Sequence, residues 1–149
     1  MTAAGTPGAL RDPEGRPVVP VILGADIGVY ALVRAFHEAY GLRSLVVSGA
    51  ALGPVAYSSI IDHVPLPAGF GADEMVARLV DLAKERSGDR LLLLANSDWL
   101  VRAVVQHRAA LEPHYVLAYL SEELLDRISE KVALSEIRSS SSSDRYAST

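Results

Sequence analysis

The stretch from Val18 to Tyr40, VVPVILGADIGVYALVRAFHEAY, constrains the fold more than any other part of this sequence. Its first six residues are apolar and mostly β-branched, which predicts a central strand of a parallel sheet that is covered on both faces. A glycine turn follows, and apolar residues then recur at three- and four-residue steps as far as Tyr40, which predicts a helix. Gly41 is typical of the residue that ends a helix. The stretch therefore predicts the opening strand–turn–helix unit of a Rossmann-like sheet.

The turn of this unit is a candidate ligand site. It places backbone N–H groups and a helix N-terminus at the carboxyl end of the strand, where anions bind. Asp26 adds a carboxylate that could bind an amine or a sugar hydroxyl, and the candidate substrate-binding residues are Gly24, Asp26, Ile27 and Gly28. The alternative is a structural turn in which Asp26 only caps the helix. The spacing GxxxG is not the GxGxxG dinucleotide fingerprint, which argues against NAD.

A second candidate site follows the apolar segment Arg90–Ala95, RLLLLA, which predicts another buried strand. Asn96, Ser97 and Asp98 come directly after it, and two such turns at one sheet edge would form a crevice. These three residues are therefore candidate substrate-binding residues as well. The alternative is that Ser97 or Asp98 only caps the next helix, a position that these residue types favour.

Three other residues near these turns have structural interpretations. Ser58 and Ser59 could complete the crevice from the loop after the second strand, but a solvated loop is the expected environment there. Trp99 is expected to pack between its helix and the sheet rather than to serve as a stacking platform.

The rest of the chain alternates strands and helices. Further strands are predicted at Ser44–Ser48, Ile60–Leu66 and His114–Ala118. Pro65 and Pro67 limit the pairing of the second of these, so it should end there or lie near an edge. Asp73 is expected to cap a helix that reaches Arg86. Within Gly49–Ser59, Gly53-Pro54 predicts a turn, and the Ala-rich flanks could form a short helical turn. The pattern predicts an α/β fold, a Rossmann-like parallel sheet of about five strands with helices on both faces.

Composition excludes several classes of function. A net charge of −4 argues against a protein that binds nucleic acid or an acidic membrane surface. There is no cysteine, hence no disulfide, thiolate metal site or thiol nucleophile. The four histidines are scattered without metal-ligand spacing, and no GxSxG elbow indicates a hydrolase. No apolar run approaches the roughly 20 residues that span a bilayer, and there is no secretory signal pattern, so we expect a cytoplasmic protein.

The two ends of the chain differ from its middle. Residues 1–17 lack periodicity and are expected to form a disordered tail, and residues 18–120 form the predicted domain. A capped amphipathic helix is predicted over 121–137. Residues 138–149 contain five consecutive serines and almost no apolar residue, so this segment is expected to be disordered too.

Five segments of the sequence, taken in order, resemble the N-terminal domain of an ATP-grasp ligase. They are VPVILGADIGVYALVRAFHEAYG, SLVVSGAALGPVAYSS, IIDHVPLP, RLLLLANSDWLV and YLSEELLDRISEKVAL, and the resemblance covers about Pro17 to Ile137. The resemblance is closest to the actinobacterial carboxylate–amine ligase type. It implies a pre-ATP-grasp domain, which packs against the ATP-grasp domains and helps to form the pocket for a small carboxylate or amine substrate.

The resemblance also implies a reaction and one further site residue. The family activates a carboxylate with ATP and magnesium as an acyl phosphate, which an amine then attacks. A lysine on the helix that leaves this domain can contact ATP phosphates, and the motif EKVAL places that role on Lys131. After Ile137, RSSSSSDRYAST stands where the ATP-grasp fold would begin, which predicts a truncated, frame-shifted or fragmentary member. We therefore expect no catalytic residue in this chain and no tight binding of ATP or magnesium.

Three hypotheses about function follow. The first is the substrate-pocket domain of an ATP-dependent carboxylate–amine ligase that is not catalytic alone. The second is a stand-alone module that binds a protein or a small ligand, with apolar surface that would favour a homodimer. The third is a small nucleotide-binding Rossmann protein.

Overall fold

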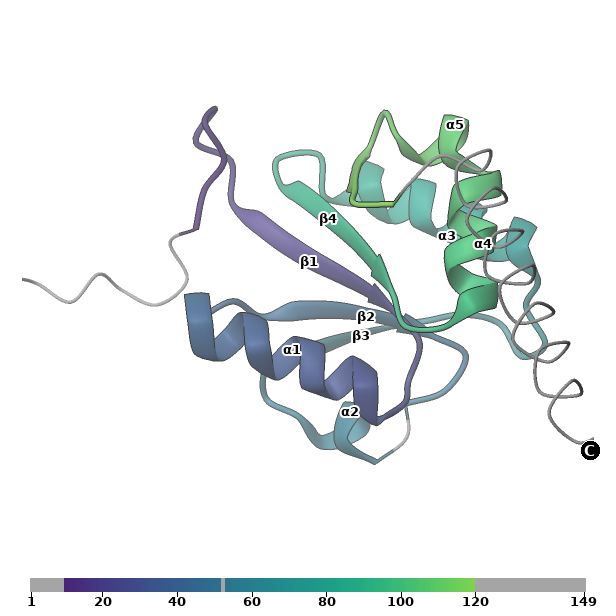
Figure 1. Ribbon diagram of the computed structural model, residues 1–149, viewed down its shortest axis with the longest axis horizontal. Coiled ribbons are helices and arrows are strands. Elements are labelled where there is room, and N and C mark those ends of the chain that lie inside the picture. Colours follow the sequence, from purple (N-terminus) through teal and green to yellow (C-terminus); the bar gives the residue numbers. More distant parts are fainter. Residues whose placement is uncertain (1–9, 52, 120–149) are drawn as a thin grey trace, which may run out of the picture. The chain divides into compact units, whose positions relative to one another are not determined.

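A five-stranded parallel sheet organises the part of the chain that the computed structural model describes, residues 10–51 and 53–119 (Figure 1). The strands are β1 Val18–Leu23, β2 Ser44–Ser48, β3 Ile61–Pro65, β4 Arg90–Ala95 and β5 Tyr115–Leu117. Their order is β3-β2-β1-β4-β5, and every neighbouring pair is parallel. The predicted α/β, Rossmann-like fold is confirmed, and β3 lies at an edge as its prolines predicted.

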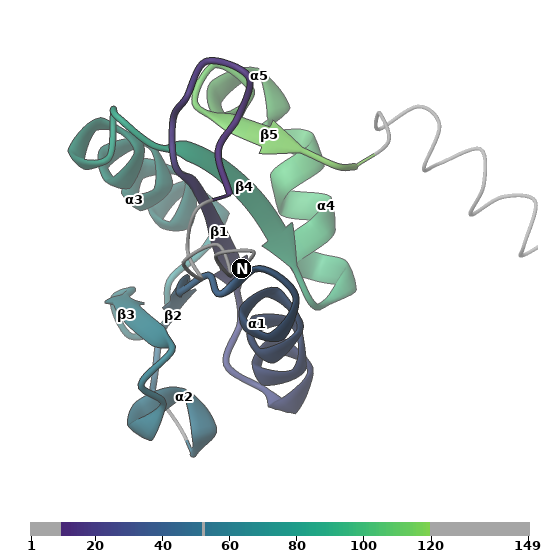
Figure 2. The same cartoon turned by 90° about the vertical axis from the view of Figure 1, so that its left-hand side faces the viewer.

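Helices cover both faces of this sheet. They are α1 Ile27–Tyr40, α2 Pro54–Tyr57, α3 Ala72–Glu85, α4 Asp98–Gln106 and α5 Arg108–Leu111. Figures 1 and 2 show α1 and α2 on one side of the sheet and α3, α4 and α5 on the other. Strands β2 and β3 lie on the outer side of β1, and β5 lies on the outer side of β4. The direction in which the chain adds strands to the sheet therefore reverses between β1 and β4. In a doubly wound sheet, ligands bind outside the carboxyl ends of the strands at such a reversal.

The core follows from the two-residue period of the strands. Ile22 of β1 is aligned with Val46 of β2, and both pack with Val29 and Val33 of α1 in one buried cluster. Val21 points to the other face, since successive side chains of a strand alternate, and it is also fully buried. A central strand buried on both faces explains why the Val18–Leu23 segment is apolar throughout.

A tyrosine ties the other edge strand to the helical layer. The hydroxyl of Tyr115 in β5 donates a hydrogen bond to the carbonyl of Leu79 in α3 at 2.7 Å. Burial of the phenol raises the pKa of Tyr115 above its ordinary value of 10.0.

The predicted capping residue is confirmed at the end of α1 and is wrong at the start of α3. Gly41 ends α1 with φ 68°, and its N–H donates to His37 O at 2.7 Å, as predicted. The prediction that Asp73 caps α3 is wrong: Gly71 is the N-cap residue, and its N–H donates to the Glu74 carboxylate at 2.9 Å. A glutamate at the third helical position can take this role.

Hydrogen bonds also connect residues that precede β1. Arg11 and Pro17 form an antiparallel bridge, and between them the Asp12 carboxylate accepts hydrogen bonds from the N–H groups of Glu14 and Arg16. Partial burial acts to raise the pKa of Asp12, but the hydrogen bonds and charge of Arg16 outweigh it and hold that pKa below its usual 3.8.

The predictions for 121–137, for 138–149 and for Lys131 lie outside the described residues. Within residues 10–51 and 53–119, no helix has the length and apolar character needed to cross a membrane.

Candidate functional site

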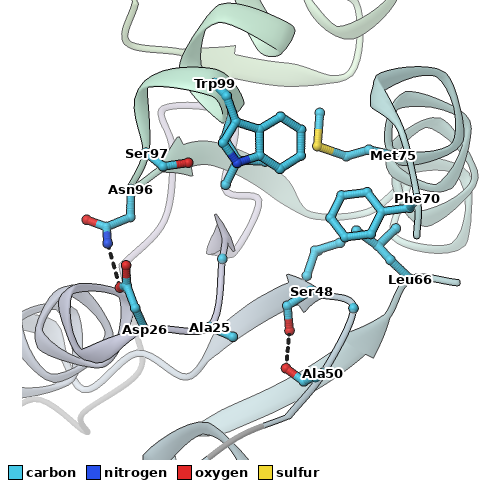
Figure 3. A pocket seen from close by; sticks show the side chains of 14 residues that line it. Ala25, Asp26, Ser48, Ala50, Leu66, Phe70, Met75, Asn96, Ser97 and Trp99 are labelled. Atoms are coloured by element: carbon cyan, nitrogen blue, oxygen red, sulfur yellow. Dashed lines mark hydrogen bonds between the residues drawn. The ribbon is translucent and has the colours of Figure 1, made fainter. Parts of the chain in front are cut away.

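A crevice of about 320 Å³ opens at the carboxyl edge of the sheet (Figure 3). Its walls come from the turn after β1, the end of β2, the turn after β4, and the segment that leads from β3 into α3. The crevice therefore lies at the reversal of strand order between β1 and β4, where this type of sheet binds ligands. The two turns singled out by the sequence both contribute to it.

The turn after β1 requires glycine at its first position. Gly24 has φ 117°, and a Cβ there would lie 3.1 Å from Val29 Cγ2. Its N–H donates to the carbonyl of Val47 at 3.1 Å, which fixes the turn against β2. Asp26 then caps α1, because its Oδ1 accepts a hydrogen bond from the N–H of Val29 at 3.0 Å. Both Gly24 and Asp26 line the crevice.

A hydrogen bond joins the two turns into one site. Asn96 Nδ2 donates to Asp26 Oδ1 at 2.5 Å, across 70 residues of sequence. Gly28 makes this contact possible, since a Cβ at that position would lie 2.6 Å from Asn96 Nδ2. Asp26 therefore both caps α1 and lines the crevice, two roles that the sequence analysis gave as alternatives.

The turn after β4 has a different character. Ser97 is the N-cap residue of α4, but its side chain makes no capping hydrogen bond. Its Oγ is buried and has no hydrogen-bond partner among the described residues. An unsatisfied buried polar group costs about 1–3 kcal/mol. Ser97 and Asn96 line the crevice, whereas Ile27, Gly28 and Asp98 are not among its lining residues.

An aromatic pair forms the opposite wall. The rings of Phe70 and Trp99 lie 5.8 Å apart between centroids and are tilted by 39°, with Met75 and Leu66 beside them (Figure 3). Trp99 is 50% exposed, so the prediction that it packs between helix and sheet is wrong. Phe70 and Met75 were not predicted as site residues, because only the strand order brings the segment after β3 to this edge.

The end of β2 supplies a further polar group that the sequence analysis missed. Ser48 Oγ donates to the carbonyl of Ala50 at 2.8 Å and lies 3.0 Å from His63 Nε2. Because the single hydroxyl proton goes to Ala50, the imidazole must be the donor in the second contact. Ser58 and Ser59, in contrast, line a separate cavity beside Tyr30 and Arg34 of α1 and do not complete the crevice.

The charge of the crevice is negative. Asp26 is the charged residue among the described residues that line it, and the remaining side chains are neutral. In the part of the chain that the structure describes, no group of three or more His, Cys, Asp or Glu side chains could hold a metal ion. These residues therefore do not fit a magnesium–ATP complex, which needs carboxylate ligands and cationic phosphate contacts.

The fold and the crevice define a doubly wound, Rossmann-like α/β domain with a crevice at the reversal of strand order, the position where such sheets bind ligands. The sequence is related to part of a D-aspartate ligase of Enterococcus faecium (strain Aus0004), with 32% identity over 128 residues. The match covers 83% of this chain and 30% of the ligase, so the chain spans less than a third of that relative's length. No protein-family model matches the sequence, and no solved structure matches it significantly.

Proposed function

We propose that this chain supplies the substrate-binding crevice of an ATP-dependent carboxylate–amine ligase and is not catalytic by itself. One structural observation carries the proposal: the Asn96–Asp26 hydrogen bond joins two polar turns into a single crevice at the reversal of strand order. The relationship to a D-aspartate ligase supports the class of reaction. D-aspartate, which the relative's name specifies, is the first candidate substrate to be tested.

In this proposal the residues of the chain bind and orient a substrate. Asp26 holds an ammonium group, and Asn96 fixes the orientation of that carboxylate through its 2.5 Å hydrogen bond. The aromatic wall of Phe70 and Trp99 would contact the apolar part of the substrate. Lys131 would contact ATP phosphates, as the family resemblance implies. ATP and magnesium would bind in the remainder of such a ligase.

A hybrid enzyme tests the proposal. The matched part of the Enterococcus faecium ligase is replaced by this chain, and substrate-dependent ATP hydrolysis is measured with D-aspartate and a panel of other amines and acids. We expect turnover by the hybrid, none by this chain alone, and a loss of at least about tenfold in kcat/KM for Asp26→Ala, since one charged contact removed contributes roughly 1.5–3 kcal/mol.

Asp81→Asn is the matched control. Asp81 is an exposed carboxylate on α3, 65% accessible and outside the crevice, so the same loss of charge there should leave turnover unchanged. A folded hybrid that shows no substrate-dependent ATP hydrolysis with any member of the panel would contradict the proposed function.

Exposed apolar side chains favour a stand-alone interaction module as a second candidate function. Tyr57 is 92% exposed, Ile27 73% and Tyr40 51%. Such side chains lose their contact with water when a second copy or another protein covers them. We expect this candidate to give a concentration-dependent homodimer in size-exclusion chromatography with light scattering, and a monomer at every concentration would count against it.

A further inference from the structure

We infer that the crevice binds a small ammonium compound with an aromatic body, and that it discriminates against an amino dicarboxylate such as D-aspartate. The role of such a compound as a substrate rests on the proposed ligase function. The chemical class of the compound is inferred from the crevice alone, through three features: the charge of one wall, the aromatic surface of the other, and an unsatisfied hydroxyl in the turn after β4.

The charge favours a cation. Val29 N–H and Asn96 Nδ2 both donate to Oδ1 of Asp26, which leaves Oδ2 without a hydrogen-bond partner among the described residues. No lysine, arginine or histidine is among the described lining residues. An ammonium ion would therefore find an acceptor there. A dicarboxylate would bring two further negative charges beside Asp26 with no cation in the described lining to offset them.

The opposite wall favours an aromatic body. Trp99 remains 50% exposed and stands in a tilted contact with Phe70. Met75 and Leu66 extend the same apolar surface (Figure 3). A ligand ring placed against these side chains would remove apolar surface from water, which stabilises a complex by about 25 cal/mol per Å². An indole face also attracts a cation more strongly than other aromatic rings do.

The unsatisfied hydroxyl of Ser97 indicates a hydrogen-bonding group on the ligand. Its Oγ is buried, has no partner among the described residues, and belongs to a residue that lines the crevice. Native proteins satisfy the great majority of such groups. An ammonium group has three N–H donors and no acceptor, so one such group can serve more than one oxygen. The Ser97 hydroxyl is therefore a second acceptor for an N–H group of the ligand, besides the second oxygen of Asp26.

Fluorescence of Trp99 provides a direct test, because it is the single tryptophan of the sequence. The full chain is titrated with phenethylammonium and with hydrocinnamate, which share a ring and linker and differ in the sign of their charge. D-aspartate and propylammonium are the further probes. We expect saturable changes with phenethylammonium and dissociation constants at least about tenfold higher for the other three compounds.

Asp26→Asn isolates the charge. Asparagine caps a helix about as well as aspartate does, so α1 should keep its start while the crevice loses its negative charge. We expect phenethylammonium to bind about tenfold more weakly to this variant and hydrocinnamate to bind more tightly. Asp81→Asn, outside the crevice, should change neither affinity. Circular dichroism and thermal unfolding verify that both variants fold.

Two results would overturn the inference. One is equal binding of phenethylammonium and hydrocinnamate to the unmodified chain, and the other is tighter binding of D-aspartate than of phenethylammonium. These failures differ from a failure of the proposed function. A hybrid ligase that turns over D-aspartate, with no charge preference in the titrations, would retain the function and reject the inference. Charge-dependent binding by the chain together with an inactive hybrid would retain the inference and reject the proposed function.

Discussion

The two turns that meet in the crevice occupy equivalent positions but use their polar side chains differently. Each follows a central strand and precedes a helix, one between β1 and α1 and the other between β4 and α4. In the first, Asp26 satisfies a helix N–H and receives the Asn96 amide. In the second, Ser97 stands at the N-cap with its hydroxyl unsatisfied by any described residue.

The difference indicates a division of roles between stability and binding. Polar groups that hold the fold are paired within the chain, as Asp26 Oδ1 is. A buried hydroxyl without a partner destabilises the free chain, and in a residue that lines a crevice a ligand can satisfy it. Under the proposed function, the turn after β1 sets the geometry of the crevice and offers the second carboxylate oxygen of Asp26, and the turn after β4 contributes the Ser97 hydroxyl. Four substitutions test this comparison.

Gly24→Ala should have the largest effect, because it affects the turn that sets the geometry. Alanine would be forced to φ 117°, and its Cβ would lie 3.1 Å from the buried Val29. We expect the free energy of unfolding in urea to fall by about 2–4 kcal/mol. Gly88→Ala is the control, since no atom lies within 4 Å of a Cβ there and its φ is not positive. Equal effects at the two glycines would remove the special role of the first turn.

Asp26→Ala should destabilise the chain by about 1 kcal/mol, the typical cost of a lost N-cap. The substitution also leaves the Asn96 amide without its acceptor. Urea unfolding monitored by circular dichroism measures the change. A loss of stability for Asp26→Ala no greater than for Asp26→Asn would show that the cap contributes nothing.

Ser97→Ala provides the matched substitution in the second turn. Because the Ser97 hydroxyl makes no hydrogen bond with the described residues, its removal should leave the stability unchanged or raise it by up to about 1 kcal/mol. The same urea titration measures it. If Ser97→Ala proves as destabilising as Asp26→Ala, the hydroxyl has a structural partner and the contrast between the turns fails.

Gly28→Ala should have the smallest net effect on stability. Alanine favours helix over glycine by about 1 kcal/mol, but its Cβ would push against the end of the Asn96 side chain. We expect these terms to offset each other to within about 1 kcal/mol while the Asn96 side-chain amide resonances move. In an Asn96→Ala background the steric term is absent, so Gly28→Ala should then be stabilising. The same effect in both backgrounds would show that Gly28 does not accommodate Asn96.

The sequence predicted the elements better than the walls of the crevice. The Val18–Leu23 run has one interpretation because a strand buried on both faces must be apolar throughout. Gly24 and Asn96 were found because polar turns after such strands meet at one edge. Trp99 was misassigned because its helical position suits either the core or a crevice wall. Ser48 and Phe70 depend on strand order and loop path, which local patterns do not contain. Asp73 failed as a cap because the helix begins two residues earlier, with Gly71 at the N-cap and Glu74 accepting from its N–H.

The most direct test of the central claim, that the two turns form one ligand site, is amide chemical-shift mapping of the full chain during titration with phenethylammonium. The prediction is that the amides of Gly24, Ala25, Asn96 and Ser97 move together with the Trp99 indole, along one saturation curve. Movement confined to one turn, or to the separate cavity beside Ser58 and Ser59, would contradict it.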